Sequence, residues 1–409
     1  MSTDRQALAW RGWLAGCFIS LSAAVGAQPL PTPVPTPVPA ATPIPAAPSV
    51  AGRAHVLIDA ETGQVLAGQN QHEPLDPASL TKVMTGYVVA AEMAAGKIGA
   101  EDLVQISENA WRQGGAGTDG SFSALAVNSQ VKLDDVLRGL VIQSGNDAAI
   151  ALAEHTAGTE AAFAELMNAY AAKLGMRDSH FVNAHGLTAE GHRMSAYDVA
   201  LLGRALIRDF PEHYALYSIK EYTYNGIKQY NRNGLLWKDA SVDGLKTGHT
   251  SAAGYCLAAS AKRGEQRLVS VVMGIQGSRK EGFRQREEGN LALLNWGFRF
   301  FETHLIYQAG STVSDAKVWK GAEESLPLVV AEALKVTLPR GRYDEVKASI
   351  SLPASVVAPV AAGAELGRLS LEFDGKQIAN VPLQAGKAIA EGGFFKRMND
   401  GFWMWWESD

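Results

Sequence analysis

The sequence is poor in the features that would crosslink it, bind it to nucleic acid or thread it through a membrane. Only two of its 409 residues are cysteines, Cys17 and Cys256, too few for a disulfide framework. No His-Glu-x-x-His pattern occurs, so no metal or other cofactor is predicted. The formal net charge is −5, which gives no reason to expect nucleic-acid binding. No internal run reaches the roughly 18–20 apolar residues of a membrane-spanning helix.

The N-terminal region is predicted to direct export. Arg5 and Arg11 accompany an apolar stretch, residues 13–25, and small residues up to Ala27 suit a cleavage site. We therefore predict a signal peptide over residues 1–27. An alternative is a lipoprotein signal that ends at Cys17. The apolar stretch is short before Cys17 and continues past it, which favours cleavage after Ala27.

The rest of the chain divides into four predicted segments. Residues 28–49 repeat Pro-Thr-Pro-Val-Pro, which favours an extended polyproline linker. Residues 50–305 have strand patterns at both ends of a helical block, which predicts one α/β (α+β) domain. Residues 306–388 read as strands, with Asp374-Gly375 as a hairpin turn, and predict a small antiparallel β domain before the tail, residues 389–409. Helices are expected over residues 80–93, 133–142, 146–156, 159–174 and 287–302, and a hairpin over residues 255–261 and 267–273.

Ser79 and Lys82 form the first candidate catalytic pair. Serine is a favoured N-cap, and the apolar run after Ser79 has the length and spacing of a helix. Residues three apart share a helix face, so Lys82 would stand over the hydroxyl as its base. The alternative is an N-cap serine followed by a surface lysine. The same pattern also occurs at Ser129 and Lys132, in a polar setting that we interpret as incidental.

Two further motifs follow in the chain. Ser144-Gly145-Asn146 stands between two predicted helices, where a hydroxyl and an amide can relay a proton and hold a substrate amide. Lys246-Thr247-Gly248 precedes the predicted hairpin and offers a cation, a hydroxyl and an edge for an extended peptide. Ser107-Glu108-Asn109 also fits the middle pattern. The ordered triplet in an exported α/β protein is far more specific than any one motif.

With these motifs the sequence resembles the active-site-serine penicillin-recognising enzymes, most closely the low-molecular-mass D-alanyl-D-alanine carboxypeptidases. The resemblance extends from about residue 54 to the C-terminus and includes residues 183–187, 231–236, 242–250 and 295–303. It implies a serine transpeptidase/β-lactamase-like catalytic domain, a small β domain and a C-terminal amphipathic helix. It also implies removal of the terminal D-alanine from peptidoglycan pentapeptides ending in D-Ala-D-Ala, and covalent inhibition by β-lactams.

The resemblance also implies roles for individual residues. Ser79 would attack the substrate carbonyl, with Lys82 as a neutral base whose pKa is lowered by the Lys246 charge and by partial burial. Ser144 would pass a proton to the leaving amine, and Asn146 would hold the substrate amide. The remaining implied substrate contacts are the Lys246 and Thr247 side chains at the carboxylate, Gly248 on the same strand, and the backbone N–H groups of Ser79 and His249 as the oxyanion hole.

A distal arginine would also bind the substrate carboxylate in this family. Counting back from Trp296 places Arg286 there, with Arg232 as a second candidate and Arg284 close enough to confuse the count. His185 is interpreted as a packed turn residue.

The C-terminal tail is predicted to lie on a membrane surface. The apolar side chains of Phe395, Met398, Phe402 and Trp406 recur at three- and four-residue steps. Acidic residues outnumber basic ones in the tail, so apolar insertion must dominate over attraction to anionic lipid. The predicted location is the periplasm, at the outer face of the inner membrane. The alternative is a tail packed on the β domain.

Two other functions fit the same fold. A class A β-lactamase has Ser-Asp-Asn as its middle motif and a glutamate that activates the deacylating water. Here Gly145 takes the central place, and residues 178–185 contain no glutamate. The other alternative is a penicillin- or peptide-binding module with little turnover.

Overall fold

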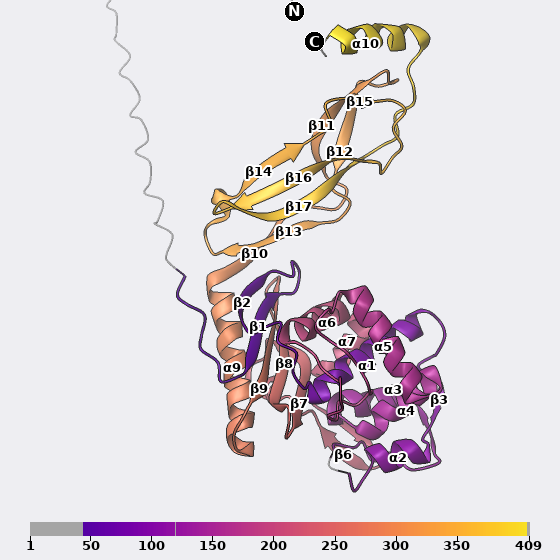
Figure 1. The fold of residues 1–409 in the computed structure, drawn as a ribbon, viewed down its shortest axis with the longest axis vertical. Coiled ribbons are helices and arrows are strands. Elements are labelled where there is room, and N and C mark those ends of the chain that lie inside the picture. Colours follow the sequence, from indigo (N-terminus) through magenta and orange to yellow (C-terminus); the bar gives the residue numbers. More distant parts are fainter. Residues whose placement is uncertain (1–43, 119, 407–409) are drawn as a thin grey trace, which may run out of the picture. The chain divides into compact units, whose positions relative to one another are not determined.

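A five-stranded antiparallel sheet organises the first domain. The computed structural model describes residues 44–118 and 120–406 (Figure 1); the predicted signal peptide, Cys17 and most of the proline-rich linker lie outside these residues. The strands follow the order β2-β1-β9-β8-β7. Their bounds are β1 Ala54–Asp59, β2 Val65–Gln69, β7 Val242–Thr250, β8 Gly254–Arg263 and β9 Gln266–Ile275. Strands from both ends of the domain therefore share one sheet, and the predicted hairpin is β8–β9.

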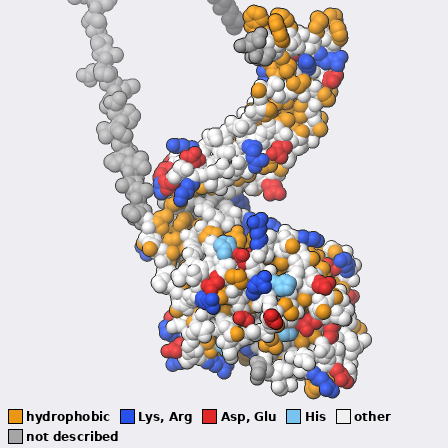
Figure 2. All heavy atoms as spheres, viewed as in Figure 1, with side chains coloured by type: hydrophobic (Ala, Val, Ile, Leu, Met, Phe, Trp, Pro, Cys, Tyr) orange, Lys and Arg blue, Asp and Glu red, His pale blue; other side chains and the backbone are white. Residues whose placement is uncertain are grey.

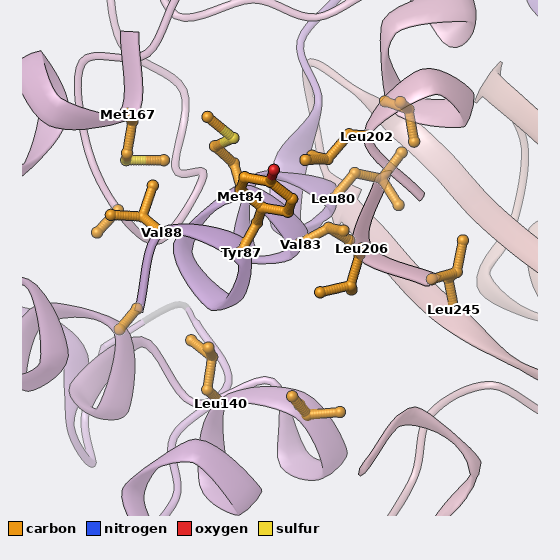
Figure 3. Packing of buried hydrophobic residues seen from close by; sticks show 14 of the residues in the cluster. Leu80, Val83, Met84, Tyr87, Val88, Leu140, Met167, Leu202, Leu206 and Leu245 are labelled. Atoms are coloured by element: carbon orange, nitrogen blue, oxygen red, sulfur yellow. The ribbon is translucent and has the colours of Figure 1, made fainter. Parts of the chain in front are cut away.

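Helices cover both faces of the sheet. Successive side chains of a strand point to opposite faces, so each strand contributes apolar side chains to both. On β9, Val269 and Val271 join the larger apolar cluster, whereas Leu268 and Val272 join the cluster beneath α9 (Arg279–Phe300). Figure 3 shows the larger cluster, in which Leu80, just before the first helix, and Val83 and other side chains of that helix meet Leu202, Leu206 and Leu245. The helices on this side are α1 Thr81–Ala94, α2 Glu108–Gly114, α3 Leu133–Arg138, η2 Gly139–Gln143, α4 Asn146–Ala157, α5 Glu160–Leu174, α6 Ala196–Asp209 and α7 Pro211–Ala215. The short helix α8 (Leu235–Lys238) contributes Leu235 and Leu236 to the cluster beneath α9.

Three local predictions are wrong in detail. Ser79 is not a helix N-cap, because it lies in a 3₁₀ turn, η1 (Ala78–Leu80), and α1 begins at Thr81. The helix predicted over residues 133–142 changes type, since α3 ends at Arg138 and the π-helix η2 follows directly. The last helix of the domain, α9, begins well before residue 287. Ser278 and Glu281 form a capping box that starts it there.

The second domain is built from strands that pair antiparallel, except that β15 pairs parallel with β11. A six-stranded sheet has the order β14-β16-β17-β12-β11-β15, and β10 pairs with β13. The bounds are β10 Phe301–Tyr307, β11 Thr312–Trp319, β12 Ser325–Val329, β13 Leu334–Pro339, β14 Lys347–Ser351, β15 Val356–Val357, β16 Glu365–Phe373 and β17 Lys376–Ala385. The predicted turn joins β16 to β17, and both Asp374 and Gly375 have positive φ, as a two-residue hairpin turn requires.

A buried polar cluster, the interdomain joint, connects β10 and β13 to the turn after β1. The Asp59 side chain is fully buried and accepts a 2.5 Å hydrogen bond from the Thr303 hydroxyl. The same carboxylate accepts the backbone N–H of Thr62, whose hydroxyl lies 2.8 Å from that of Thr337. β10 begins directly after α9, so the second domain follows the helix without a loop.

The C-terminal helix α10 (Phe394–Trp406) has a docked polar side and an exposed apolar side. Asp400 is buried and accepts the Lys320 backbone N–H at 2.6 Å. Lys396 donates to both Asp400 and Glu324. Figure 2 shows hydrophobic side chains gathered over this helix; the exposed ones are Phe394, Phe395, Met398, Phe402, Trp403, Trp405 and Trp406. None of the helices in residues 44–406 is long and apolar enough to cross a membrane.

Candidate active site

Ser79 lies in a tight turn that a distant loop holds from the side. Ala78 adopts a left-handed conformation with φ 47°, and Ser79 follows it within η1. A Cβ on Gly186 would lie 1.9 Å from the Ala78 carbonyl oxygen, and its φ of +89° also favours glycine. The Ser79 side chain caps no helix, so its hydroxyl is available for chemistry.

Lys82 directs its amine at three oxygens from separate parts of the chain. Its Nζ lies 3.1 Å from Ser79 Oγ, 2.7 Å from Asn146 Oδ1 and 2.6 Å from the His185 carbonyl oxygen. The last two oxygens can only accept, whereas a hydroxyl can also donate. The arrangement therefore suits a neutral amine, which would give its two N–H bonds to Asn146 and His185 and accept the Ser79 proton on its lone pair.

Burial controls the protonation of Lys82. The side chain is 1% exposed, and burial lowers its pKa to about 7. The Asp147 charge opposes this shift, the Arg232 charge adds to it, and a weaker effect of Glu160 raises the pKa. The Lys82 pKa is thus lowered, in the direction that the resemblance implied. The expected cause was wrong in one respect, because burial of Lys82 is complete instead of partial. Lys82 and Lys246 repel each other's charge, and Arg232 is a further cation that lowers the Lys82 pKa.

The Ser-Gly-Asn motif joins η2 to α4. Ser144 adopts a left-handed conformation, φ 66°, and is buried. Within the described part of the chain, its Oγ has no hydrogen-bond partner. An unpaired buried hydroxyl is uncommon and is typical of functional positions. The backbone N–H of Asn146 donates to the Ser121 carbonyl at 2.7 Å, so the motif also contacts the loop that precedes β4 (Gln130–Lys132).

The Lys-Thr-Gly motif lies on β7, the edge strand of the sheet, and η1 packs beside it. An edge strand can accept an extended peptide as a further strand. Lys246 is 2% exposed, and burial together with the charges of Lys82 and Arg232 holds its pKa well below the usual 10.5. Thr247 is also buried, and the His249 ring stacks on Tyr255 with centroids 4.1 Å apart.

The structure separates the three candidate arginines. Arg286 is buried, donates to the Arg232 carbonyl at 3.2 Å and lies 4.5 Å from the centre of the Phe283 ring. Burial lowers the pKa of Arg286 to about 10. Arg284 is exposed and pairs with Glu288 at 2.7 Å. Arg286 and Arg232 therefore belong to one cluster, and Arg284 does not.

Together these residues form a cation cluster, which we define as Lys82, Lys246, Arg232 and Arg286. Over residues 44–118 and 120–406, none of the four forms an ion pair with a carboxylate. Their charges act on one another through buried space, since both arginines and Lys82 lower the pKa of Lys246. Such a site favours an anionic ligand.

Sequence reasoning missed part of this environment. The His185 carbonyl is an acceptor for Lys82, while the His185 ring is engaged within its own turn, where Nδ1 accepts the Leu187 N–H. Burial lowers the pKa of His185 to about 3. Asp147 and Glu160, which act on Lys82 through their charges, were also missed. A glycine directly after His185 was the available signal for a close backbone approach.

The competing motifs are occupied elsewhere. Ser129 donates to the Ala126 carbonyl, and Lys132 pairs with Glu101 at 2.5 Å instead of with Ser129. Ser107 caps α2 by accepting the Ala110 N–H. In the part of the chain that the structure describes, no group of three His, Cys, Asp or Glu side chains could hold a metal ion.

Comparison with known families gives matches to both domains. A family model for D-alanyl-D-alanine carboxypeptidase matches residues 41–277. A second, for the C-terminal domain of penicillin-binding protein 5, matches residues 301–391.

Individual relatives cover most of the chain. The D-alanyl-D-alanine carboxypeptidase DacA of Escherichia coli K12 is 44% identical over 356 residues, 86% of this chain and 87% of that protein. Penicillin-binding protein 5 from Haemophilus influenzae aligns with a TM-score of 0.79 at 41% identity, over 85% of this chain and 99% of that one. The cefotaxime-bound form of penicillin-binding protein D2 from Listeria monocytogenes aligns at 0.55 and 28% identity, over 62% of this chain and 100% of that one.

Proposed function

The chain belongs to the D-alanyl-D-alanine carboxypeptidase family, and we propose that it removes the terminal D-alanine from peptidoglycan pentapeptides through an acyl-enzyme on Ser79. The observation that carries this proposal is the contact between Ser79 Oγ and the buried amine of Lys82, whose pKa is about 7. A lysine with that pKa is largely neutral at slightly alkaline pH and can act as a base.

Acylation begins with proton transfer from the Ser79 hydroxyl to the Lys82 lone pair. Ser79 Oγ then attacks the carbonyl carbon of the penultimate residue, and the backbone N–H groups of Ser79 and His249 stabilise the oxyanion. When the C–N bond breaks, the leaving amine takes a proton from the Ser144 hydroxyl, which Lys82 replenishes. Water then hydrolyses the ester and releases the shortened peptide.

The substrate would lie along β7, with its carboxylate among the cations. The strand offers its free edge, where the proposed oxyanion hole places the backbone N–H of His249, and Thr247 adds a hydroxyl. Lys246, Arg286 and Arg232 supply charge for the terminal carboxylate, while Asn146 holds the substrate amide. A β-lactam would enter the same site and acylate Ser79, as a carboxylate-bearing mimic of the D-Ala-D-Ala end.

The test uses the full chain and a peptide that ends in D-Ala-D-Ala. Ser79→Ala should abolish both D-alanine release and covalent labelling by fluorescent penicillin. Ser129→Ala, the matched control from the second Ser-x-x-Lys pattern, should retain both. Labelling at Ser129 would overturn the assignment. Penicillin labelling without D-alanine release by the unaltered chain would instead favour a binding module.

The proposed location is the outer face of the cytoplasmic membrane, reached by export. Support comes from α10, whose polar side docks on the β domain through Asp400 while Phe395, Phe402 and Trp403 remain exposed. Aromatic side chains of this kind suit the membrane interface. The tail over residues 391–409 has two basic and four acidic residues, so attachment would depend on apolar area. Both predictions for the tail therefore apply to different sides of α10. The polar side packs on the β domain, as the alternative expected, and the apolar side is free for the proposed membrane contact.

A further inference from the structure

Asp147, the residue after the Ser-Gly-Asn motif, has a carboxylate that the proposed mechanism leaves unused. The side chain is fully buried in the first turn of α4. Its Oδ1 accepts the N–H of Ser123 at 2.8 Å and that of Ala148 at 2.9 Å, and its Oδ2 lies 3.3 Å from the Leu125 N–H. Every one of these partners is a donor. Burial raises the pKa of Asp147, and these hydrogen bonds oppose that shift. They favour the ionised form, since a carboxylate can accept all of them without placing a proton against an N–H.

These bonds fasten a loop, residues 121–125, to the rear of the motif. The Ser121 carbonyl accepts the Asn146 N–H at 2.7 Å, so the loop and the motif are joined from both directions. The Ser123 hydroxyl lies so close that a Cβ on Gly145 would be 1.9 Å from it. Gln229 holds the other side of the loop by donating to the Ser123 carbonyl at 3.0 Å. Moving the loop would therefore move Ser144 and Asn146.

The same carboxylate faces a site dominated by positive charge. In the described residues, no member of the cation cluster has a carboxylate within ion-pairing distance. The negative charges that act on Lys82 therefore belong to carboxylates beyond that distance. On Lys82 the Asp147 charge is the largest effect after burial and exceeds that of Glu160.

Other titratable groups face the Lys82 amine as well. Arg232 lowers its pKa, and the Lys82 charge in turn lowers the pKa values of Lys246, His185 and His192. Both histidines have strongly lowered pKa values, so they are neutral near pH 7 and contribute no net charge there. Asp147 and the more exposed Glu160 are thus the anionic groups that act on Lys82.

We propose that Asp147 is a positioning residue that holds the 121–125 loop against Ser144 and Asn146 and supplies the buried negative charge that balances the cation cluster. The proposal rests on the proposed function, because it assigns Lys82 as the base. Removing the charge would destabilise protonated Lys82, so the base would become neutral at lower pH. Removing the hydrogen bonds would loosen the loop and slow acylation at every pH.

The experiment compares the pH dependence of Ser79 acylation by a chromogenic β-lactam in the full chain and in Asp147→Asn. The acid limb of the variant should move to lower pH by roughly 0.5–1, and its plateau rate should fall about tenfold. Gln229→Met is the matched control, because it loosens the same loop without changing charge. It should lower the plateau and leave the acid limb in place.

An Asp147→Asn enzyme with a slower plateau but an unmoved acid limb would overturn the charge role and leave a structural one. An unchanged plateau would overturn the loop role. Either result with Ser79 still labelled contradicts this inference alone, whereas loss of Ser79 labelling in the unaltered chain contradicts the proposed function.

A second measurement covers the case in which Asp147→Asn does not fold. Carbon NMR of aspartate-labelled unaltered protein should then show an ionised Asp147 carboxylate over the pH range in which Lys82 titrates, near 7, with a change in its chemical shift as Lys82 titrates. A protonated Asp147 over that range would overturn the proposal.

Discussion

Replacing Lys82 by methionine should change how stability depends on pH, in a direction set by the burial of the amine. Burial lowers the Lys82 pKa from 10.5 to about 7. An unfolded chain therefore binds this proton below about pH 10.5, whereas the folded protein binds it only below about 7. Between these limits the unfolded state holds more protons, so the free energy of unfolding of the unaltered protein rises with pH. The destabilisation by Lys82 is complete below pH 7 and vanishes above pH 10.5.

The magnitude follows from the two pKa values. Their difference corresponds to about 5 kcal/mol. Methionine removes this penalty but leaves Asn146 Oδ1 and the His185 carbonyl without a donor, at a cost of roughly 1–3 kcal/mol each. These terms are similar in size, so the informative quantity is the slope with pH. The stability of Lys82→Met relative to the unaltered protein should fall by about 3 kcal/mol between about pH 7 and about pH 9.5.

Urea denaturation followed by far-ultraviolet circular dichroism measures this slope. Lys132→Met is the matched control. Lys132 is exposed and its pKa is raised by hydrogen bonding to Glu101, so this variant should show no slope over the same range. A Lys82→Met difference that stays constant with pH would refute the argument that folding keeps Lys82 neutral, and with it the physical basis for a lysine base.

Three further outcomes are expected. Arg286→Ala should raise KM for D-Ala-D-Ala peptides by an amount equivalent to roughly 1.5–3 kcal/mol and slow acylation by a β-lactam ester less, whereas Arg284→Ala should do neither; an unchanged KM in steady-state assays would move the role to Arg232. A chain ending at Ala390 should remain active but no longer float with liposomes, and binding of the full chain should be nearly insensitive to salt; release by salt would contradict attachment through apolar area. Thr303→Val should lower the free energy of unfolding by roughly 1.5–3 kcal/mol in urea titrations by breaking the bond to Asp59, without changing the labelling of Ser79 by penicillin; loss of labelling would show that the interdomain joint also shapes the site.

The sequence predicted the side chains that meet at the site because they occur as ordered motifs. Ser79, Lys82 and Asn146 come together as expected, and Lys246 lies beside Lys82 closely enough to respond to its charge. A backbone carbonyl that accepts a hydrogen bond gives no comparable signal in the sequence. The His185 carbonyl makes the shortest of the Lys82 contacts, yet any residue type could supply it.

Fold prediction failed where local signals had to compete with packing. The serine that looked like an N-cap lies in a 3₁₀ turn, because Gly186 and β7 pack against that turn and set its conformation. The start of α9 could have been found, since Ser278 and Glu281 form a recognisable capping box. The contribution of Arg232 to the Lys82 pKa depends on tertiary distances that spacing along the chain does not contain.

Because α9 passes into β10 without a loop, a rotation of the second domain at Phe301 would tilt the helix as a rigid body. With about 1.5 Å of rise per residue, Arg286 stands about 21 Å from the end of the helix at Phe300. A tilt of about 3° at that end would displace the guanidinium by about 1 Å, enough to slow an enzyme about a hundredfold when the displaced group positions substrate. A load on the β domain would therefore reach the carboxylate end of the site unless something resisted it. The buried hydrogen bond from Thr303 to Asp59 restrains this tilt, because it fixes the start of β10 to the turn after β1.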